Sequence, residues 1–163
     1  MEQVDDTRVM VLREIGRLPP GDGPATIEGV AGPAFVEWIG ELRGSSDRER
    51  RAHANRIAHS PVPHRAVLLR NVGGAVVAGG QLVSEGDVAG LYDVFTAGGE
   101  RGRGHARAVC SHLLAHALDA GARAAYLQVD AANHAARQAY GSLGFVDAYA
   151  YHYRSPPATA APG

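Results

Sequence analysis

The chain has 163 residues, which suits one domain with a hydrophobic core and is too short for two domains of ordinary size. Its formal net charge of −1 favours neither a nucleic-acid partner nor an acidic membrane surface. No apolar run reaches the roughly 20 residues that span a bilayer, and the N-terminus lacks the apolar segment of a signal peptide. The single cysteine, Cys110, cannot form an internal disulfide. We therefore expect a soluble, cytoplasmic protein.

The first part of the chain predicts short elements separated by proline and glycine. Residues 7–15 suit a short strand, and segment 16–24 is the best linker candidate because it is rich in proline and glycine. Residues 25–30 predict an edge strand. A helix is expected over residues 33–44, with proline at its start and glycine at its end. A second helix is expected over residues 47–59, and we interpret its run of charges as a solvated face.

Beyond these helices the apolar pattern changes to that of strands. Residues 64–70 and 75–84 flank the sequence NVGG, a glycine-rich hairpin signal, and residues 88–96 supply a third antiparallel strand. A glycine-rich loop follows, and then an amphipathic helix that ends at Gly121.

The last part of the chain predicts a buried strand at 124–130, a short helix with Asn133 as its N-cap, and an alternating strand at 145–154. The order is therefore strand, two helices, three antiparallel strands, helix, strand, helix, strand. This order predicts an α/β fold in which a mixed sheet carries helices on both faces. Residues 155–163 are expected to be disordered.

The loop before the third helix has a composition that suits an anion. The segment VFTAGGERGRGHARAVCSHLLAHAL places glycines and arginines between a strand and a helix start. Unpaired backbone N–H groups and the helix dipole attract an anion there, glycines allow a phosphate to approach closely, and arginines add donors. The loop therefore predicts a phosphate site, and a flexible surface turn is the plainer alternative.

Two common phosphate motifs do not fit this loop. A P-loop requires a lysine that the region lacks, and a dinucleotide fingerprint requires a small residue where Arg107 stands. What fits is RGRGHA, with Arg101, Gly104 and Ala106 in an Arg/Gln-x-x-Gly-x-Gly/Ala pattern. A second segment, NHAARQAYGSLGF, follows one strand later.

Together these two motifs resemble those of the GNAT (Gcn5-related) N-acetyltransferase family. The second motif matches the family's Asn-x-x-Ala-x-x-x-Tyr-x-x-x-Gly-Phe pattern with Asn133, Ala136, Tyr140, Gly144 and Phe145. The resemblance covers residues 64–154 well and the two earlier helices loosely. It implies a GNAT-like mixed, mostly antiparallel sheet with splayed central strands, and a transfer of acetyl groups to amines.

The resemblance implies acetyl-CoA as the co-substrate. Its pyrophosphate would lie on the backbone N–H groups of Arg101, Gly102, Arg103, Gly104, His105 and Ala106. Its pantetheine arm would bind like an extra strand along the edge formed by Val94, Phe95 and Thr96, chiefly at the first and last of these. Asn133 would contact the cofactor arm where the strands splay apart, either in addition to capping its helix or only as a cap.

Tyr140 is the expected general acid, because a phenol near the CoA sulfur can protonate the departing thiolate. The alternative is that it only packs beneath Ala136. Asp93 is the best candidate for the general base, since it interrupts an apolar strand and is expected on the face of Leu91 and Phe95. It could instead bind the ammonium of the substrate. His152 is a second candidate base.

The acceptor is expected to be the primary amine of a small molecule or a peptide. Phe35 and Trp38 from the early helices, with the tyrosines of the closing strand, are expected to line its pocket. We expect no metal, because His112 and His116 have the spacing of zinc ligands but lack a third partner. No nucleic-acid or membrane partner is expected, and a homodimer is left open.

Two alternatives to an active transferase remain. Residues 1–24 could be the strand and linker left from a tandem partner domain, with a GNAT domain over 25–154; the chain would then be a non-catalytic half or a CoA-binding module. The other alternative is a phosphate- or nucleotide-binding module without transfer chemistry.

Overall fold

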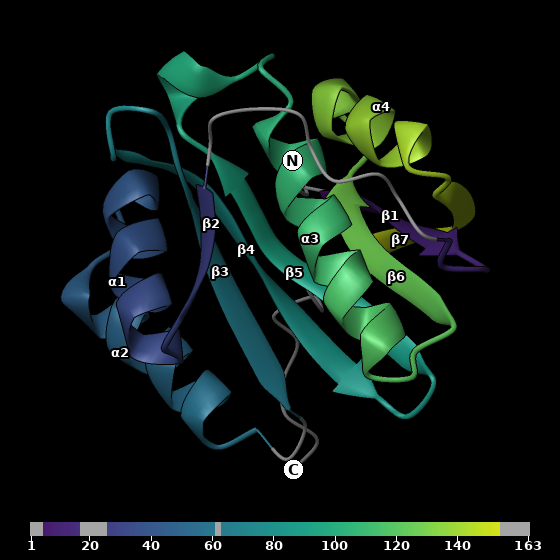
Figure 1. Cartoon of the computed structure of the whole chain (residues 1–163), viewed down its shortest axis with the longest axis horizontal. Coiled ribbons are helices and arrows are strands. Elements are labelled where there is room, and N and C mark those ends of the chain that lie inside the picture. The colour runs from purple at the N-terminus through teal and green to yellow at the C-terminus, as the bar shows by residue number, and fades with distance from the viewer. Residues whose placement is uncertain (1–4, 17–25, 61–62, 154–163) are drawn as a thin grey trace, which may run out of the picture.

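The computed structural model describes residues 5–16, 26–60 and 63–153. Within this part of the chain the strands form one sheet in the order β2-β3-β4-β5-β6-β1-β7 (Figure 1). The strands are β1 (Asp5–Leu12), β2 (Thr26–Val30), β3 (His64–Arg70), β4 (Val76–Glu85), β5 (Val88–Thr96), β6 (Ala124–Asp130) and β7 (Val146–Tyr153). The helices are α1 (Gly32–Arg43), α2 (Asp47–Ala58), the short 3-10 helix η1 (Gly98–Glu100), α3 (His105–Asp119) and α4 (His134–Ser142).

Each strand expected from the sequence is present, and the sheet contains both parallel and antiparallel pairs. All neighbouring strands are antiparallel except β5 and β6, which run parallel. That parallel pairing extends only from Val88 to Leu91 on β5, against Ala124 to Leu127 on β6. Beyond this point the two strands separate. The expected mostly antiparallel sheet with splayed central strands is therefore confirmed.

The two faces of the sheet carry different helices. On β3, Val67 and Leu69 belong to the core beneath α3, whereas Ala66 and Leu68 pack with residues of α1. On β4 a Cβ at Gly79 would meet Phe35 of α1, and a Cβ at Gly80 would meet residues of α3. Because successive strand residues point to opposite faces, α1 and α3 lie on opposite sides of the sheet.

The strand expected near the N-terminus lies inside the sheet. β1 pairs with β6 on one side and with β7 on the other, both antiparallel (Figure 1). Met10 and Leu12 of β1 belong to the main core. Most of the expected linker and the expected disordered tail fall outside the described residues, so those two expectations remain predictions.

The helix ends follow the signals in the sequence. Gly44 ends α1 in a left-handed conformation with φ 66°, and Asn133 caps α4 through its side-chain oxygen, which accepts from the Ala136 N–H at 3.2 Å. None of the helices in the described part of the chain combines the length and the apolarity that a membrane crossing needs.

α2 depends on its cap more than the other helices do. It has no buried residue, and it begins with a capping box in which Ser46 and Glu49 bond each other's backbone N–H groups at 3.2 and 2.7 Å. Because this helix carries side chains of the pocket described below, its N-terminus affects the site.

Replacing Ser46 with alanine should therefore weaken α2. We expect Ser46→Ala to lower the free energy of unfolding by about 1 kcal/mol, the usual loss for an N-cap hydroxyl. Urea denaturation measures this change, and amide hydrogen exchange locates it in α2. Ser45→Ala is the matched control and should change the free energy of unfolding much less. Equal effects of the two substitutions would contradict a capping role for Ser46.

Candidate functional site

β5 contains a bulge at Asp93, close to where β5 and β6 separate. Gly79 of β4 faces Phe95 and Gln81 faces Tyr92, so β5 has one residue more than β4 over this stretch. Asp93 has φ 52°, a left-handed conformation that no other described residue except glycine adopts. Aspartate and asparagine tolerate this conformation better than most residues.

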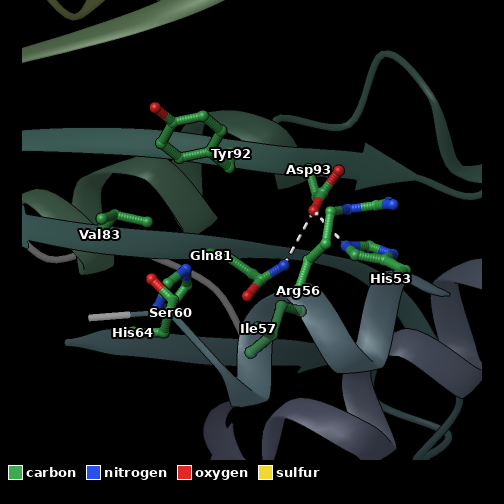
Figure 2. Close-up of a pocket in the computed structure, with 9 residues that line it drawn as sticks. All are labelled: His53, Arg56, Ile57, Ser60, His64, Gln81, Val83, Tyr92 and Asp93. Atoms are coloured by element: carbon green, nitrogen blue, oxygen red, sulfur yellow. Dashed lines mark hydrogen bonds and ion pairs between the residues drawn. The ribbon is translucent and has the colours of Figure 1, made fainter. Parts of the chain in front are cut away.

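The bulge changes which side chains share a face. Tyr92 and Asp93 are neighbours in sequence, yet both line one pocket on the α2 side of the sheet (Figure 2). Phe95 lies on this side too, packed edge-on against Trp38 of α1. Leu91 belongs to the opposite core, beneath α3. The expectation that Asp93 shares a face with Leu91 is therefore wrong, because the extra residue shifts the alternation.

The Asp93 carboxylate is held by three side chains. Gln81 Nε2 donates to Oδ2 at 2.9 Å, His53 Nε2 lies 3.1 Å from Oδ2, and Arg43 pairs with Oδ1 at 3.2 Å (Figure 2 shows the first two). His53 comes from α2, whose charges we expected to be a solvated face. Its side chain is only 20% exposed and faces the sheet. His53 departs from the expected pattern, which other residues of the same helix follow: the exposed Asp47, Arg48, Glu49 and Arg51.

A pocket of about 280 Å³ opens around Asp93 between α2 and the strands β3, β4 and β5. His53, Arg56 and Ile57 of α2 form one wall, and Gln81, Val83 and Tyr92 belong to the sheet (Figure 2). Phe35, expected in the acceptor pocket, is fully buried in the core instead. The side chains of the closing-strand tyrosines and of His152 lie outside the described residues.

Tyr92 and Tyr126 mark the point where the two strands part. Their hydroxyls are 2.8 Å apart, and their rings meet edge-on with centroids 6.1 Å apart. Tyr92 follows Leu91, the last residue of β5 that pairs with β6, and Tyr126 precedes Leu127, the partner of Leu91. Gly90 makes room for them, because a Cβ there would lie 2.8 Å from the Tyr126 ring. Burial, and then the bond to Tyr92, raise the pKa of Tyr126, so the Tyr126 hydroxyl stays protonated at neutral pH.

Beyond Tyr92 and Tyr126, β5 remains paired with β4 but no longer pairs with β6. Phe95 and Thr96 still pair with Gly79 and Ala78 of β4, whereas no pairing with β6 extends beyond Leu91. A strand in this situation turns one set of backbone N–H and C=O groups toward the gap. The expected cofactor edge, Val94 to Thr96, thus has the geometry that a linear amide chain could extend.

The glycine loop continues from this strand into α3. Gly102 and Gly104 have φ 80° and 78°, and an added Cβ at either position would enter open space. Gly104 is the N-cap residue of α3 and offers no side chain to the first N–H groups of the helix. These N–H groups and the dipole of a long helix therefore remain available to an anion.

Glu100 is a member of this loop that sequence reasoning overlooked. His105 Nε2 lies 3.1 Å from its carboxylate, and Arg103 lies 3.4 Å away. Arg101 is exposed and forms no ion pair with any residue that the structure describes. Arg101 is thus the side chain of the loop most available to a phosphate.

Tyr140 lies in the main core, 7% exposed, with its ring 6.2 Å from that of Phe145. Burial, and to a lesser extent the neighbouring Cys110, raise the pKa of the Tyr140 phenol. The hydroxyl is therefore fully protonated at neutral pH, the state in which a phenol can donate a proton. The cap made by Asn133 is observed; its expected contact with a cofactor remains a prediction.

His112 and His116 of α3 contact each other with 3.2 Å between their Nε2 atoms. Burial, then His116 and Arg65, lower the pKa of His112. Across the described residues, no group of three or more His, Cys, Asp or Glu side chains is arranged to hold a metal ion.

A comparison of the chain with known proteins identifies its family. The model of the acetyltransferase (GNAT) family matches residues 33–145. No curated protein sequence matches the chain at a significant level. The family match includes the pocket, the bulged strand, the glycine loop and both motifs of the sequence.

Solved structures with the same fold are distant in sequence. A GCN5-related N-acetyltransferase from Sphaerobacter thermophilus matches with a TM-score of 0.72 and 20% identity, over 94% of this chain and 53% of that one. One from Kribbella flavida matches with 0.66 and 21%, over 95% and 60%. This chain thus spans little more than half the length of these two structures. An aminoglycoside acetyltransferase from an uncultured soil metagenomic sample matches with 0.62 and 20%, over 81% and 97%.

The strained backbone at Asp93 predicts a contrast between two substitutions. Asp93→Val should lower the free energy of unfolding by about 2 to 4 kcal/mol, because valine resists the left-handed conformation and leaves three partners without an acceptor. Asp93→Asn tolerates the backbone and keeps one acceptor oxygen, so its loss should stay below about 1.5 kcal/mol. Urea denaturation measures both losses. Similar losses would show that the left-handed backbone of the bulge does not restrict which residue can occupy position 93.

Proposed function

Because this chain belongs to the GNAT family of acetyltransferases, we propose that it transfers an acetyl group from acetyl-CoA to the primary amine of a small molecule or a peptide. The observation that carries this proposal is one continuous arrangement on β5. The pocket around Asp93, the strand edge without a β6 partner and the glycine loop follow one another along residues 92–104. An acceptor in the pocket would meet a linear cofactor on the strand edge.

The residues present fit acetyl-CoA. The open space at Gly102 and Gly104 and the uncapped N–H groups of α3 suit a pyrophosphate, with Arg101 as an additional donor. The edge from Val94 to Thr96 suits the amides of pantetheine. When bound, acetyl-CoA supplies a thioester whose acetyl group passes to the amine while the CoA thiolate leaves.

Asp93 and its partners would prepare the amine. An amine enters as an ammonium and must lose a proton before its nitrogen attacks the thioester carbonyl carbon. The Asp93 carboxylate can hold the ammonium and accept its proton, and His53, bonded to it at 3.1 Å, keeps the carboxylate in place. Asp93 therefore anchors the amine and takes its proton, which passes to solvent when the product leaves.

Tyr140 would complete the transfer. Cleavage of the carbon–sulfur bond leaves a thiolate, which takes the proton of a nearby phenol. The raised pKa of Tyr140 keeps that proton in place until the thiolate forms. The alternative, in which Tyr140 contributes only packing against Phe145, gives a different kinetic result.

A second candidate is a GNAT-fold half without catalysis. One observation favours it: β1 lies between β6 and β7 although it precedes the rest of the fold. Such a half would bind CoA and leave amines unmodified. Release of free CoA in the presence of an amine panel separates the two candidates.

Acetyl-CoA should raise the melting temperature of the protein, because a ligand at 100 times its Kd stabilises the native state by about 2.7 kcal/mol. CoA should act nearly as well and ATP much less. Differential scanning fluorimetry measures these shifts. A folded protein that does not respond to acetyl-CoA would contradict the proposal, and a stronger response to ATP would favour a nucleotide-binding module.

The glycine loop should carry most of this affinity. Arg101→Ala should weaken acetyl-CoA binding by roughly 1–3 kcal/mol through the loss of a charge-assisted hydrogen bond. Arg123→Ala, at an exposed arginine beyond the other end of α3, is the control and should have little effect. Gly104→Val should abolish binding, because its side chain would enter the open space beside α3; circular dichroism must show that this variant folds. Wild-type affinity in the Arg101 and Gly104 variants would mean that the phosphate lies elsewhere.

Tyr140→Phe separates catalysis from packing. The change removes only the hydroxyl, so acetyl-CoA affinity should barely change, while kcat should fall by roughly 10²–10⁴ with KM nearly constant. Steady-state kinetics with an accepted amine measure this split. Full turnover in the variant would identify Tyr140 as a core residue only.

A further inference from the structure

The charges around the pocket are unusual for a site that receives a cation. Asp93 is the only acidic side chain among the described residues that line it, and Arg43 and His53 already pair with its carboxylate. Arg56 adds a guanidinium to the same wall (Figure 2). A simple ammonium would therefore enter a pocket whose fixed charges are not negative in sum.

Arg56 is the charged side chain of this pocket that no other described residue binds. Among the described residues it forms no ion pair or hydrogen bond, whereas Arg43 holds Asp93 and Arg50, earlier on α2, holds Glu37 at 3.3 Å. Figure 2 shows its side chain extending from α2 toward β5. A guanidinium with five unengaged donors beside a pocket suits a planar or tetrahedral anion, which it can bind through two parallel hydrogen bonds.

Gln81 offers a hydrogen-bond acceptor that the amine of a substrate could use. Its side chain is 2% exposed and its Nε2 donates to Asp93. A carboxylate only accepts, so the amide nitrogen faces Asp93, and the amide oxygen on the same carbon points toward Ile57 of α2 (Figure 2). That oxygen, Oε1, is buried and has no hydrogen-bond partner in the part of the chain that the structure describes. A buried acceptor of this kind needs a donor, and an ammonium beside Asp93 would supply it.

We propose that the acceptor is an amine that also carries an anionic group, a carboxylate or a phosphate: its nitrogen bonds Gln81 Oε1 and Asp93, and Arg56 binds its anion. This inference rests on the proposed acetyl transfer and names the substrate class for it. The pocket of about 280 Å³ suits a molecule of the size of an amino acid. A polycation such as the acceptor of an aminoglycoside acetyltransferase would instead need several acidic side chains, and this pocket provides one.

The test compares amines that differ only in the anionic group. Free CoA release is measured with α-amino acids against their decarboxylated amines, with O-phosphoethanolamine against ethanolamine, and with neamine as the polycation. We expect kcat/KM to favour the anionic member of a pair by at least about tenfold, the value of one charge-assisted contact. The better of the carboxylate and phosphate series identifies the anion.

Arg56→Gln should raise the KM of the preferred anionic amine by about tenfold or more and leave that of its neutral counterpart within about twofold. Arg51→Gln is the matched control, because Arg51 is an exposed arginine of α2 outside the pocket, and it should change neither. Calorimetric titration of the CoA complex with the same anionic amine should show the same loss of affinity without turnover.

The outcomes separate this inference from the function on which it rests. Protein that acetylates neutral amines or neamine better than their anionic counterparts would overturn the inference and leave the transferase standing. An equal loss for anionic and neutral amines in Arg56→Gln would also overturn it, since Arg56 would then act on the fold. Failure to bind acetyl-CoA, or to turn over any amine, would overturn the proposed function itself.

Discussion

The bulge in β5 is the constraint on which the site depends. One extra residue at Asp93, held in a left-handed conformation, turns Tyr92 and Asp93 to the same face of the sheet. It lies two residues beyond the last pairing of β5 with β6, so the carboxylate stands beside the gap between the strands. A regular strand would alternate its side chains and send one of the two into the α3 core. Side chains from α1, α2 and β4 fix the bulge by bonding the carboxylate from three directions.

Two kinds of electrostatic environment meet at β5. At its C-terminal end, the glycine loop and the start of α3 offer backbone N–H groups in open space, where a phosphate can remain hydrated on one side. Around Asp93 the charges come from side chains, and several of them already neutralise one another. In the proposed function, the loop would bind the cofactor anion and the pocket would select the acceptor. Gln81 Oε1 and the Arg56 guanidinium are the polar groups available there without a partner among the described residues.

Sequence reasoning predicted the elements well because their signals are local. Gly44 ends α1 and Asn133 caps α4 as expected, and the NVGG turn joins β3 to β4. The interpretation failed where the partner was remote. His53 was not singled out, because nothing near it in sequence reveals that Asp93, 40 residues later, lies 3.1 Å away. Phe35 was expected in the acceptor pocket because an aromatic residue on an amphipathic helix has the same pattern whether it lines a pocket or fills a core.

By itself the sequence determined the α/β class and the order of the elements, and it predicted an anion site at the glycine loop, because periodicity, caps and glycines act over a few residues. The two motifs also indicated the family that the comparison confirmed. The tertiary structure alone decided that β1 lies between β6 and β7, that the alternation of β5 breaks at Asp93, and that α2 rather than α1 forms the helical wall of the pocket. These features depend on pairing and packing between segments tens of residues apart, and the residues themselves carry no local mark of their partners.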